Sequence, residues 1–254
     1  ITKSDKKVDS HNGLLTDSVA VFCEQNLHAF DSPVLLYSLE QIPDTDSTTA
    51  TFNIYNVPKS IAEAILIQVG RTLMNDLEQP DSVVRINSLG DNESLTRYSR
   101  ELTNFFRKRL DSMPSTAREL MKEHPLFALS DLISRDDDLA YKCPNPLEYL
   151  SDQSRKHFRE IIEYLEMTDT PYEIEPRMIN NHECYSDALF SIDNMASEET
   201  DTDTPSLSIQ GGRYDEFVYR KTRSHIPAVG VVVRYTNSKP PTTYTQSQED
   251  QAIS

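Results

Sequence analysis

Residues 60–91, SIAEAILIQVGRTLMNDLEQPDSVVRINSLGD, hold the clearest secondary-structure pattern of the chain. Apolar residues recur there every four positions, at Ile61, Ile65, Val69 and Leu73. This spacing predicts an amphipathic helix over residues 60–77. The β-branched run at 83–89 ends at a glycine and predicts a buried strand. A helix that leads directly into a strand indicates a mixed α and β domain in which the helix packs on a sheet.

Weaker patterns on either side complete the expected set of elements. Further helices are expected at residues 15–29, 92–110, 114–122 and 151–167. Further strands are expected at 34–39, 51–57, 172–175, 184–192, 207–212 and 228–235. The first two strands are close enough to form a hairpin, and Asp91 is placed to cap the helix that follows it. The order of strands, helical block and strands predicts an α+β fold with one mixed or antiparallel sheet and a helical insertion.

The 254-residue chain is strongly acidic. It has 25 Lys and Arg against 41 Asp and Glu, a formal net charge of −16. Nucleic-acid affinity comes mainly from basic side chains that neutralise phosphates, so this balance argues against tRNA binding. No apolar run approaches the roughly 18 residues of a membrane span, and residues 1–12 lack the apolar stretch of a signal peptide. We therefore expect a cytoplasmic protein without membrane contact.

The cysteines suggest no metal site. Cys23, Cys143 and Cys184 are widely spaced, and no CxxC pair occurs. Such spacing predicts neither a zinc site nor a disulfide framework, and an odd number of cysteines fits a reducing compartment. We expect no metal and no cofactor.

Several short segments, taken in order, carry a family resemblance. They are RINSLGD at 85–91, YLSDQSRKHF at 149–158, PYEIEPR at 171–177, QGGRYD at 210–215 and IPAVG at 226–230. In this order they resemble the INSLG, YL…HF, PYEINPR, GGGRYD and IPAVGF motifs of the histidyl-tRNA synthetases. Weaker similarity around residues 26–28 and 33–37 extends the resemblance over most of the chain. It implies the class II synthetase fold, an antiparallel sheet flanked by helices with a helical insertion.

The resemblance also divides the chain into parts. Residues 1–13 are expected to be a polar lead-in, and residues 238–254, rich in Pro, Thr, Gln and Ser, a disordered tail. Residues 14–90 and 170–237 correspond to the synthetase-like core, and residues 91–169 to the helical insertion. No segment of the chain resembles the family's motif 1, which builds a dimer interface, or its anticodon-binding domain.

The chemistry of the family depends on arginines that this chain does not have. Amino-acid activation joins a carboxylate to the α-phosphate of ATP, so fixed cations must hold two anions together. The resemblance places the three expected arginines at Pro43 in motif 2, Asn180 in the RGLDYY motif and Asn237 in motif 3. No Arg or Lys occurs between residues 30 and 57. Because losing one such contact typically costs about a hundredfold in rate, we expect no catalytic residue and no enzymatic activity.

Other substrate-binding positions of the family are also altered. Asp17 keeps a shortened carboxylate where the family has RPEGT, Asn181 replaces a glycine, and the QFHQ strand becomes Thr51–Ile54 with an aliphatic residue at its end. Arg234 lies three positions before the motif 3 position, which in a strand is the opposite face.

A remnant ligand pocket is one interpretation of what is left. Its candidate residues are Asp17, Tyr185, Gly211, Gly212, Arg213, Tyr214 and Asp215. The alternative is structural: a strand that needs small residues for close packing, with an Arg213–Asp215 ion pair. His182 and Glu183 are adjacent and would point to opposite faces of a strand, which argues against an acid–base pair.

Three functional hypotheses follow from the resemblance. The first is a non-catalytic synthetase-like module that acts by protein–protein association, with a protein partner or as a homo-oligomer. The second is a fragment of a true histidine–tRNA ligase, which would need a basic surface and a motif 2 arginine. The third is a small-ligand binding subunit, like the histidyl-synthetase-like subunit that regulates ATP phosphoribosyltransferase.

Overall fold

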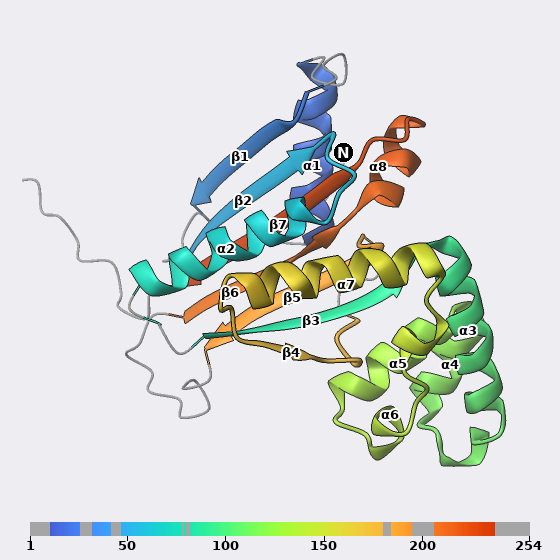
Figure 1. The fold of residues 1–254 in the computed structure, drawn as a ribbon. Helices are drawn as coiled ribbons and strands as arrows, with labels where there is room; N and C mark the ends of the chain where they lie inside the picture. Colours follow the sequence, from blue (N-terminus) through green and yellow to red (C-terminus); the bar gives the residue numbers. More distant parts are fainter. Residues whose placement is uncertain are drawn as a thin grey trace, which may run out of the picture.

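The chain folds around one seven-stranded sheet, with strands in the order β1-β2-β7-β6-β5-β3-β4 (Figure 1). The computed structural model describes residues 11–25, 32–41, 47–77, 79, 82–179, 184–194 and 206–236. The strands are β1 (Val34–Gln41), β2 (Ser47–Tyr55), β3 (Ser82–Gly90), β4 (Tyr172–Ile174), β5 (Asp187–Asn194), β6 (Ser206–Arg213) and β7 (Ala228–Thr236). Neighbouring strands pair antiparallel, except that β3 and β4 are parallel. The predicted α+β fold and the β1–β2 hairpin are confirmed.

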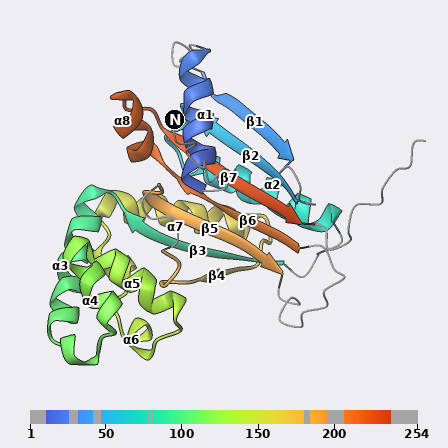
Figure 2. The same cartoon turned by 180° about the vertical axis from the view of Figure 1, so that it is seen from behind.

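Helices cover both faces of this sheet. Helices α2 (Ile61–Asp76) and α7 (Asp152–Met167) cross one face, and α1 (His11–Glu24) packs on the opposite face against β1 and β7 (Figures 1 and 2). A block of helices stands beside β3: α3 (Asn92–Arg107), η2 (Leu110–Ser112), α4 (Ser115–Glu123), α5 (Pro125–Ser134), α6 (Asp138–Tyr141) and η3 (Pro146–Tyr149). Helix α8 (Asp215–Thr222) follows β6 and contacts α1 and β7.

Strand residues alternate between two apolar cores, because successive side chains point to opposite faces of a sheet. On β7, Val229, Val231 and Val233 belong to the core under α2 and α7. The second core lies between the other face, α1 and the helical block, and includes Leu15, Phe22, Tyr55, Tyr185 and Tyr214. The centre of the sheet is therefore covered on both sides.

Asp91 joins the core to the helical block. Its carboxylate caps α3 by accepting from Ser94 N at 2.9 Å and Ser94 Oγ at 2.7 Å. The same carboxylate accepts from Ser151 Oγ at 2.6 Å, and Ser151 is the N-cap of α7. Burial alone would raise the pKa of Asp91, but the hydrogen bonds from Ser151 and Ser94 hold that pKa below its ordinary value. Asp91 is therefore the N-cap of α3, as predicted, and it also binds the serine that caps α7, which was not predicted.

Several predicted boundaries differ from the structure. Helix α1 spans residues 11–24 rather than 15–29, so the end of the expected lead-in is helical. The strand expected from residue 184 begins at Asp187, which has a positive φ of 60°. Helix α8 was not predicted: its eight residues carry only a short apolar stretch, although Asp215 and Glu216 in its first turn and Arg220 and Lys221 in its last turn suit a helix dipole. Residues 1–10, the acidic segment 195–205 and the tail 237–254 lie outside the described residues.

Replacing Asp91 by alanine tests the junction. Asp91→Ala removes the N-cap acceptor of α3, which typically costs about 1 kcal/mol, and also the hydrogen bond that Ser151, the N-cap of α7, donates to Asp91. With about 1 kcal/mol for that second bond, we expect the free energy of unfolding to fall by about 2 kcal/mol. Asp152→Ala, which removes an exposed first-turn carboxylate of α7, is the control and should cost about 0.5 kcal/mol. Urea denaturation measures both, and equal losses would contradict the junction role.

Candidate functional site

The face of the sheet opposite α2 and α7 is filled around Gly212 by Tyr185. A Cβ atom on Gly212 would lie 3.0 Å from two ring atoms of Tyr185 and 2.5 Å from the backbone oxygen of Ala188. Tyr185 itself is buried. The glycine therefore makes room for a side chain of the same protein, and that ring occupies the space above the strand.

The neighbouring position on β7, Gly230, is closed in the same way. A Cβ atom there would lie 2.4 Å from Asn53 Oδ1, 2.8 Å from the Tyr214 ring and 3.4 Å from Leu15. Tyr214 donates its hydroxyl hydrogen to Asn53 Oδ1 at 2.8 Å, and Tyr55 shares a 2.8 Å hydrogen bond with Ser18. These polar groups are satisfied by one another, so the centre of this face is a packed polar and aromatic layer.

The QGGRYD segment is divided between the two faces. Gly212 and Tyr214 belong to the α1 side, whereas Arg213 points to the α2 side. A Cβ atom on Gly211 would meet the Phe190 ring at 2.5 Å, in the α2-side core. The segment follows the period of two of a strand, so its side chains do not line a single pocket.

Arg213 forms a buried ion pair with Glu63 of α2. Its Nε lies 2.7 Å from Glu63 Oε1 and its Nη2 2.9 Å from Oε2, a bidentate geometry, and both side chains are almost completely buried. The expected pair with Asp215 is longer, at 3.4 Å. Asp215 instead accepts the backbone amide of Ala228 at 2.7 Å. The structure thus gives Arg213 a structural partner that lies 150 positions away in the sequence.

His157 of α7 completes this cluster. Its Nε2 lies 2.7 Å from Glu63 Oε1. Burial lowers the pKa of His157, but the hydrogen bond and charge of Glu63 outweigh burial and raise that pKa above its ordinary value. Burial alone would raise the pKa of Glu63. The hydrogen bonds and positive charges of His157 and Arg213 outweigh burial and hold that pKa below its ordinary value. Both helices on this face are therefore tied to the end of β6 by charge.

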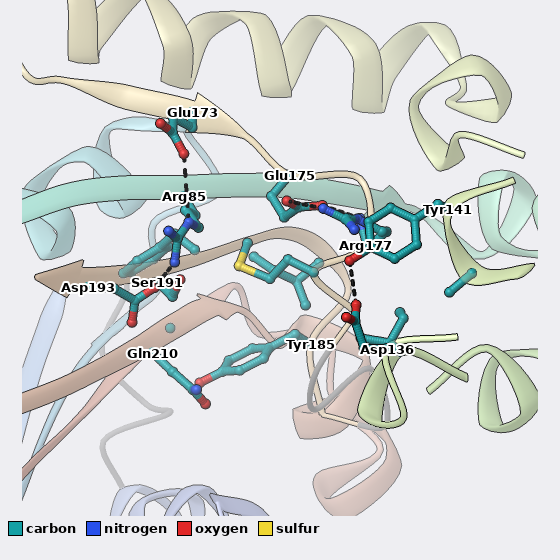
Figure 3. Close-up of a pocket in the computed structure, with 16 residues that line it drawn as sticks. Arg85, Asp136, Tyr141, Glu173, Glu175, Arg177, Tyr185, Ser191, Asp193 and Gln210 are labelled. Atoms are coloured by element: carbon teal, nitrogen blue, oxygen red, sulfur yellow. Dashed lines mark hydrogen bonds and ion pairs between the residues drawn. The ribbon is translucent and has the colours of Figure 1, made fainter. Parts of the chain in front are cut away.

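Beside the filled centre lies an open pocket of about 480 Å³ between β3, β5, β6 and the helical block (Figure 3). Its apolar wall comes from Ile133, Ala140, Met178 and Leu189. Tyr185, whose ring lies over Gly212, also lines the pocket. Arg85 and Arg177 reach into it from the strand side, each next to carboxylates (Figure 3).

The charges of this pocket are already paired. Arg85 lies 3.0 Å from Asp193 and 3.7 Å from Glu173. Arg177 donates hydrogen bonds from Nε and Nη2 to the two carboxylate oxygens of Glu175, at 2.9 and 3.0 Å. Its guanidinium carbon lies 4.0 Å from the centre of the Tyr141 ring. The lining has two arginines against four carboxylates, the fourth being Asp136, a difference of −2. A phosphate would meet a net negative wall here, which disfavours binding of a nucleotide.

The structure brings only part of the candidate set together. Tyr185, Gly212 and Tyr214 lie on one face, Arg213 lies on the other, and Asp17 is exposed on the outer side of α1. Whether any of them binds a ligand stays a prediction. Glu63 and His157 were missed, because their roles arise from contacts across the fold. The period of two in residues 210–215 could have shown that their side chains face two ways.

The positions of the expected arginines are described only in part. Pro43, Asn180, Asn181, His182, Glu183 and Asn237 lie outside the described residues. On β2, Ile54 belongs to the α2-side core, so the aliphatic replacement faces away from the filled centre, whereas buried Thr51 and Asn53 face it. Arg234 follows Val233 on β7 and so lies on the same face as Gly230, four residues along the strand.

Among the described residues, no group of three or more His, Cys, Asp or Glu side chains is arranged to hold a metal ion. In that same part of the chain, every helix is too short or too polar to span a membrane.

Known proteins similar in sequence are histidine–tRNA ligases. The chloroplastic enzyme of Porphyra purpurea is 26% identical over 172 residues, which are 68% of this chain and 39% of that protein. The enzyme of Streptococcus mutans is 29% identical over 157 residues, 61% of this chain and 35% of that protein. The chain thus spans less than half the length of these relatives. No protein-family model matches the sequence.

Several solved structures share the fold of this chain. Apo histidyl-tRNA synthetase of Staphylococcus aureus superimposes with a TM-score of 0.63 at 15% identity, over 85% of this chain and 53% of that chain. An ATP phosphoribosyltransferase regulatory subunit/histidyl-tRNA synthetase of Bacillus halodurans superimposes with a TM-score of 0.52 at 15% identity, over 86% of this chain and 60% of that chain. A chain of the Thermotoga maritima ATP phosphoribosyl transferase complex superimposes with a TM-score of 0.50 at 13% identity, over 86% of this chain and 79% of that chain. The chain has the class II fold of the histidyl-tRNA synthetases.

The raised pKa of His157 predicts a pH-dependent stability. A group whose pKa is raised by folding contributes stability that is complete below its unfolded pKa and is lost as the pH rises through the folded value. From pH 6.5, the ordinary histidine pKa, upward we expect the free energy of unfolding to fall. The variant His157→Gln should lack this part of the slope, and urea titrations across that range measure it. An identical slope in both proteins would contradict the role of His157.

The Tyr185→Ala variant tests whether Tyr185 fills space. Removing a buried aromatic ring leaves a cavity and should cost about 3–5 kcal/mol in the free energy of unfolding. Tyr141→Ala, at the pocket but 57% exposed, is the matched control and should cost about 1 kcal/mol through its lost contact with Arg177. Chemical denaturation compares the two. If Tyr185→Ala costs no more than the control, the ring does not hold this face together.

Proposed function

We propose that this chain, which has the class II synthetase fold, is a non-catalytic, degenerate paralogue of the histidyl-tRNA synthetases that acts through association with another protein chain. Its role on this proposal is regulation or assembly rather than amino-acid activation or tRNA binding. The net charge of −16 supports the absence of tRNA binding.

The filled centre of the α1-side face is the observation that carries this proposal. Gly212 and Gly230 belong to the QGGRYD and IPAVG segments that resemble synthetase motifs, and a ligand bound at these motifs would need open space above them. Here Tyr185 lies over Gly212, while Tyr214, Asn53 and Leu15 surround Gly230. Opening this layer would break the Tyr214–Asn53 hydrogen bond and expose buried rings, which costs free energy that substrate binding would have to offset.

The electrostatics of the open pocket support the same conclusion. Activation needs unpaired cations near the phosphates. Arg85 and Arg177 are both paired with carboxylates, and the lining carries two more negative than positive groups. Across the described part of β1 and β2, which stand where the family's motif 2 would be, the sequence has no Arg or Lys.

Association with another protein is supported by one structural neighbour. The Thermotoga maritima structure, which has a similar fold, is a complex of an ATP phosphoribosyl transferase. We extend that mode of action to this chain: a synthetase-like scaffold that is used for binding another chain. The proposal does not carry over the activity of the ligase relatives. The chain spans only 39% of the Porphyra purpurea ligase and 35% of the Streptococcus mutans ligase.

A small-ligand binding regulatory subunit is the second candidate. The observation in its favour is the pocket of about 480 Å³, which is within the usual size range for small-molecule sites. Such a ligand would have to tolerate the net negative wall. A cationic or zwitterionic molecule such as an amino acid fits this condition better than a nucleotide.

A histidine-dependent ATP–pyrophosphate exchange assay tests the proposal. We expect no exchange above the background of a sample without protein, because the cations that hold two anions together are absent. A bona fide histidyl-tRNA synthetase is the positive control. Exchange that depends on histidine and scales with the concentration of this protein would show that it is an enzyme.

Thermal shift then separates the two non-catalytic candidates. A ligand at 100 times its Kd raises the free energy of unfolding by about 2.7 kcal/mol, so binding shifts Tm clearly. The association proposal predicts no shift with histidine or ATP, whereas the ligand-binding candidate predicts a shift with histidine. The variant Asp193→Ala, which alters the pocket wall, would abolish a shift that arises there.

A further inference from the structure

Among the residues that the structure describes, strand β1 is an edge of the sheet and has none of the usual protection. It pairs with β2 on one side, and its other side is the end of the sheet (Figure 1). Natural edge strands are usually short or carry lysines, prolines or bulges that prevent further pairing. β1 has eight residues in regular register, no proline and no lysine, and Glu40 is its one charged residue.

The face of β1 that carries Leu35, Tyr37 and Leu39 is also exposed to solvent. Leu35, Tyr37 and Leu39 are 73%, 75% and 69% exposed. Their partners on β2 are Ile54, Phe52 and Ala50, which belong to or pack against the α2-side core. Helix α2 packs against β7, β6, β5 and β3. The row of three large side chains therefore extends the apolar face of the sheet beyond the helix that covers it.

The opposite face of the same strand is covered. Val34 and Leu36 pack against the core that includes Leu15 and Phe22 of α1. The exposure is thus confined to one face and the outer edge of a strand whose other face is held in place by α1. An ordered strand of this kind is a template for another strand.

We propose that β1 pairs antiparallel with β1 of a second copy of this chain and so forms a two-fold symmetric dimer through one continuous sheet. The inference rests on the proposed function, in which the chain acts by association, and names the surface and the partner. An antiparallel pair of identical strands is self-complementary, so a single surface provides both sides of the contact.

The charges of β1 fit a second copy. With Tyr37 opposite Tyr37 of the second copy, Leu35 faces Leu39 and Glu40 faces Val34, so the register brings no like charges together. The six exposed side chains then form one apolar strip. A strand of eight residues is about 27 Å long, which gives an interface at the small end of specific protein contacts. We therefore expect a reversible dimer whose population rises with protein concentration.

Sedimentation equilibrium of the purified chain over a roughly hundredfold concentration range tests the dimer, because a small interface dissociates on dilution. Tyr37→Lys should raise the dimer dissociation constant by about a hundredfold or more, since it removes two apolar contacts and places two like charges face to face. Met167→Lys is the matched control: it changes the same charge at a side chain that is 79% exposed on α7, and it should leave the dissociation constant unchanged.

A cross-link tests the register. Residues opposite each other in an antiparallel pair have Cα atoms about 4.5–5.5 Å apart, within the range of a disulfide. Tyr37→Cys should therefore give a covalent dimer under mild oxidation, which the wild-type chain with its three cysteines should not.

The outcomes separate this inference from the proposed function. A wild-type chain that stays monomeric over the whole range, or a dimer that Tyr37→Lys leaves intact, overturns the β1 dimer. If the same sample shows no pyrophosphate exchange, the non-catalytic proposal survives and the partner is a different chain. Exchange activity overturns the proposed function whatever the mass of the protein.

Discussion

The buried ion pair between Glu63 and Arg213 holds the two layers of the fold together. Glu63 belongs to α2, Arg213 ends β6, and His157 of α7 contacts the same carboxylate. Breaking a buried pair by removing one partner leaves an uncompensated charge, a loss of about 3–5 kcal/mol. The cluster joins both helices to the end of β6, where the chain turns into α8. The arginine of the QGGRYD segment thus has a buried structural partner in Glu63.

The same strand geometry decides what the other face can do. With Arg213 directed to α2, its neighbours Gly212 and Tyr214 must point to the α1 side. There Tyr185 and Tyr214 close the space above the two glycines of β6 and β7. What remains open is the adjoining pocket, whose arginines are neutralised by carboxylates. The centre of this face is therefore filled, and the pocket beside it carries a net negative wall.

The elements that local pattern determines were predictable, whereas the contacts between distant residues were not. Helix α2 and strand β3 follow from spacing alone, and the Asp91 cap follows from its position before Asn92. Helix α8 was missed because eight residues with polar ends give a weak periodic signal. The Glu63–Arg213 contact joins residues 150 positions apart, and no local pattern can indicate it. The directions in which the side chains of residues 210–215 point could have been predicted, because successive residues of any strand face opposite sides. The exposed row on β1 could not have been predicted, because an apolar run does not show which of its two faces a helix covers.

The central claim is that this chain's own side chains fill the space above Gly212 and Gly230 and leave no room there for ATP. The most direct measurement is a titration of the folded protein with ATP and magnesium, followed by the backbone amide signals of Gly212 and Gly230 in NMR spectra. The account predicts that neither signal moves at ATP concentrations that saturate a genuine histidyl-tRNA synthetase. Saturable shifts at both glycines, together with a change in the ring signals of Tyr185, would show that the layer opens for the nucleotide and would contradict the account.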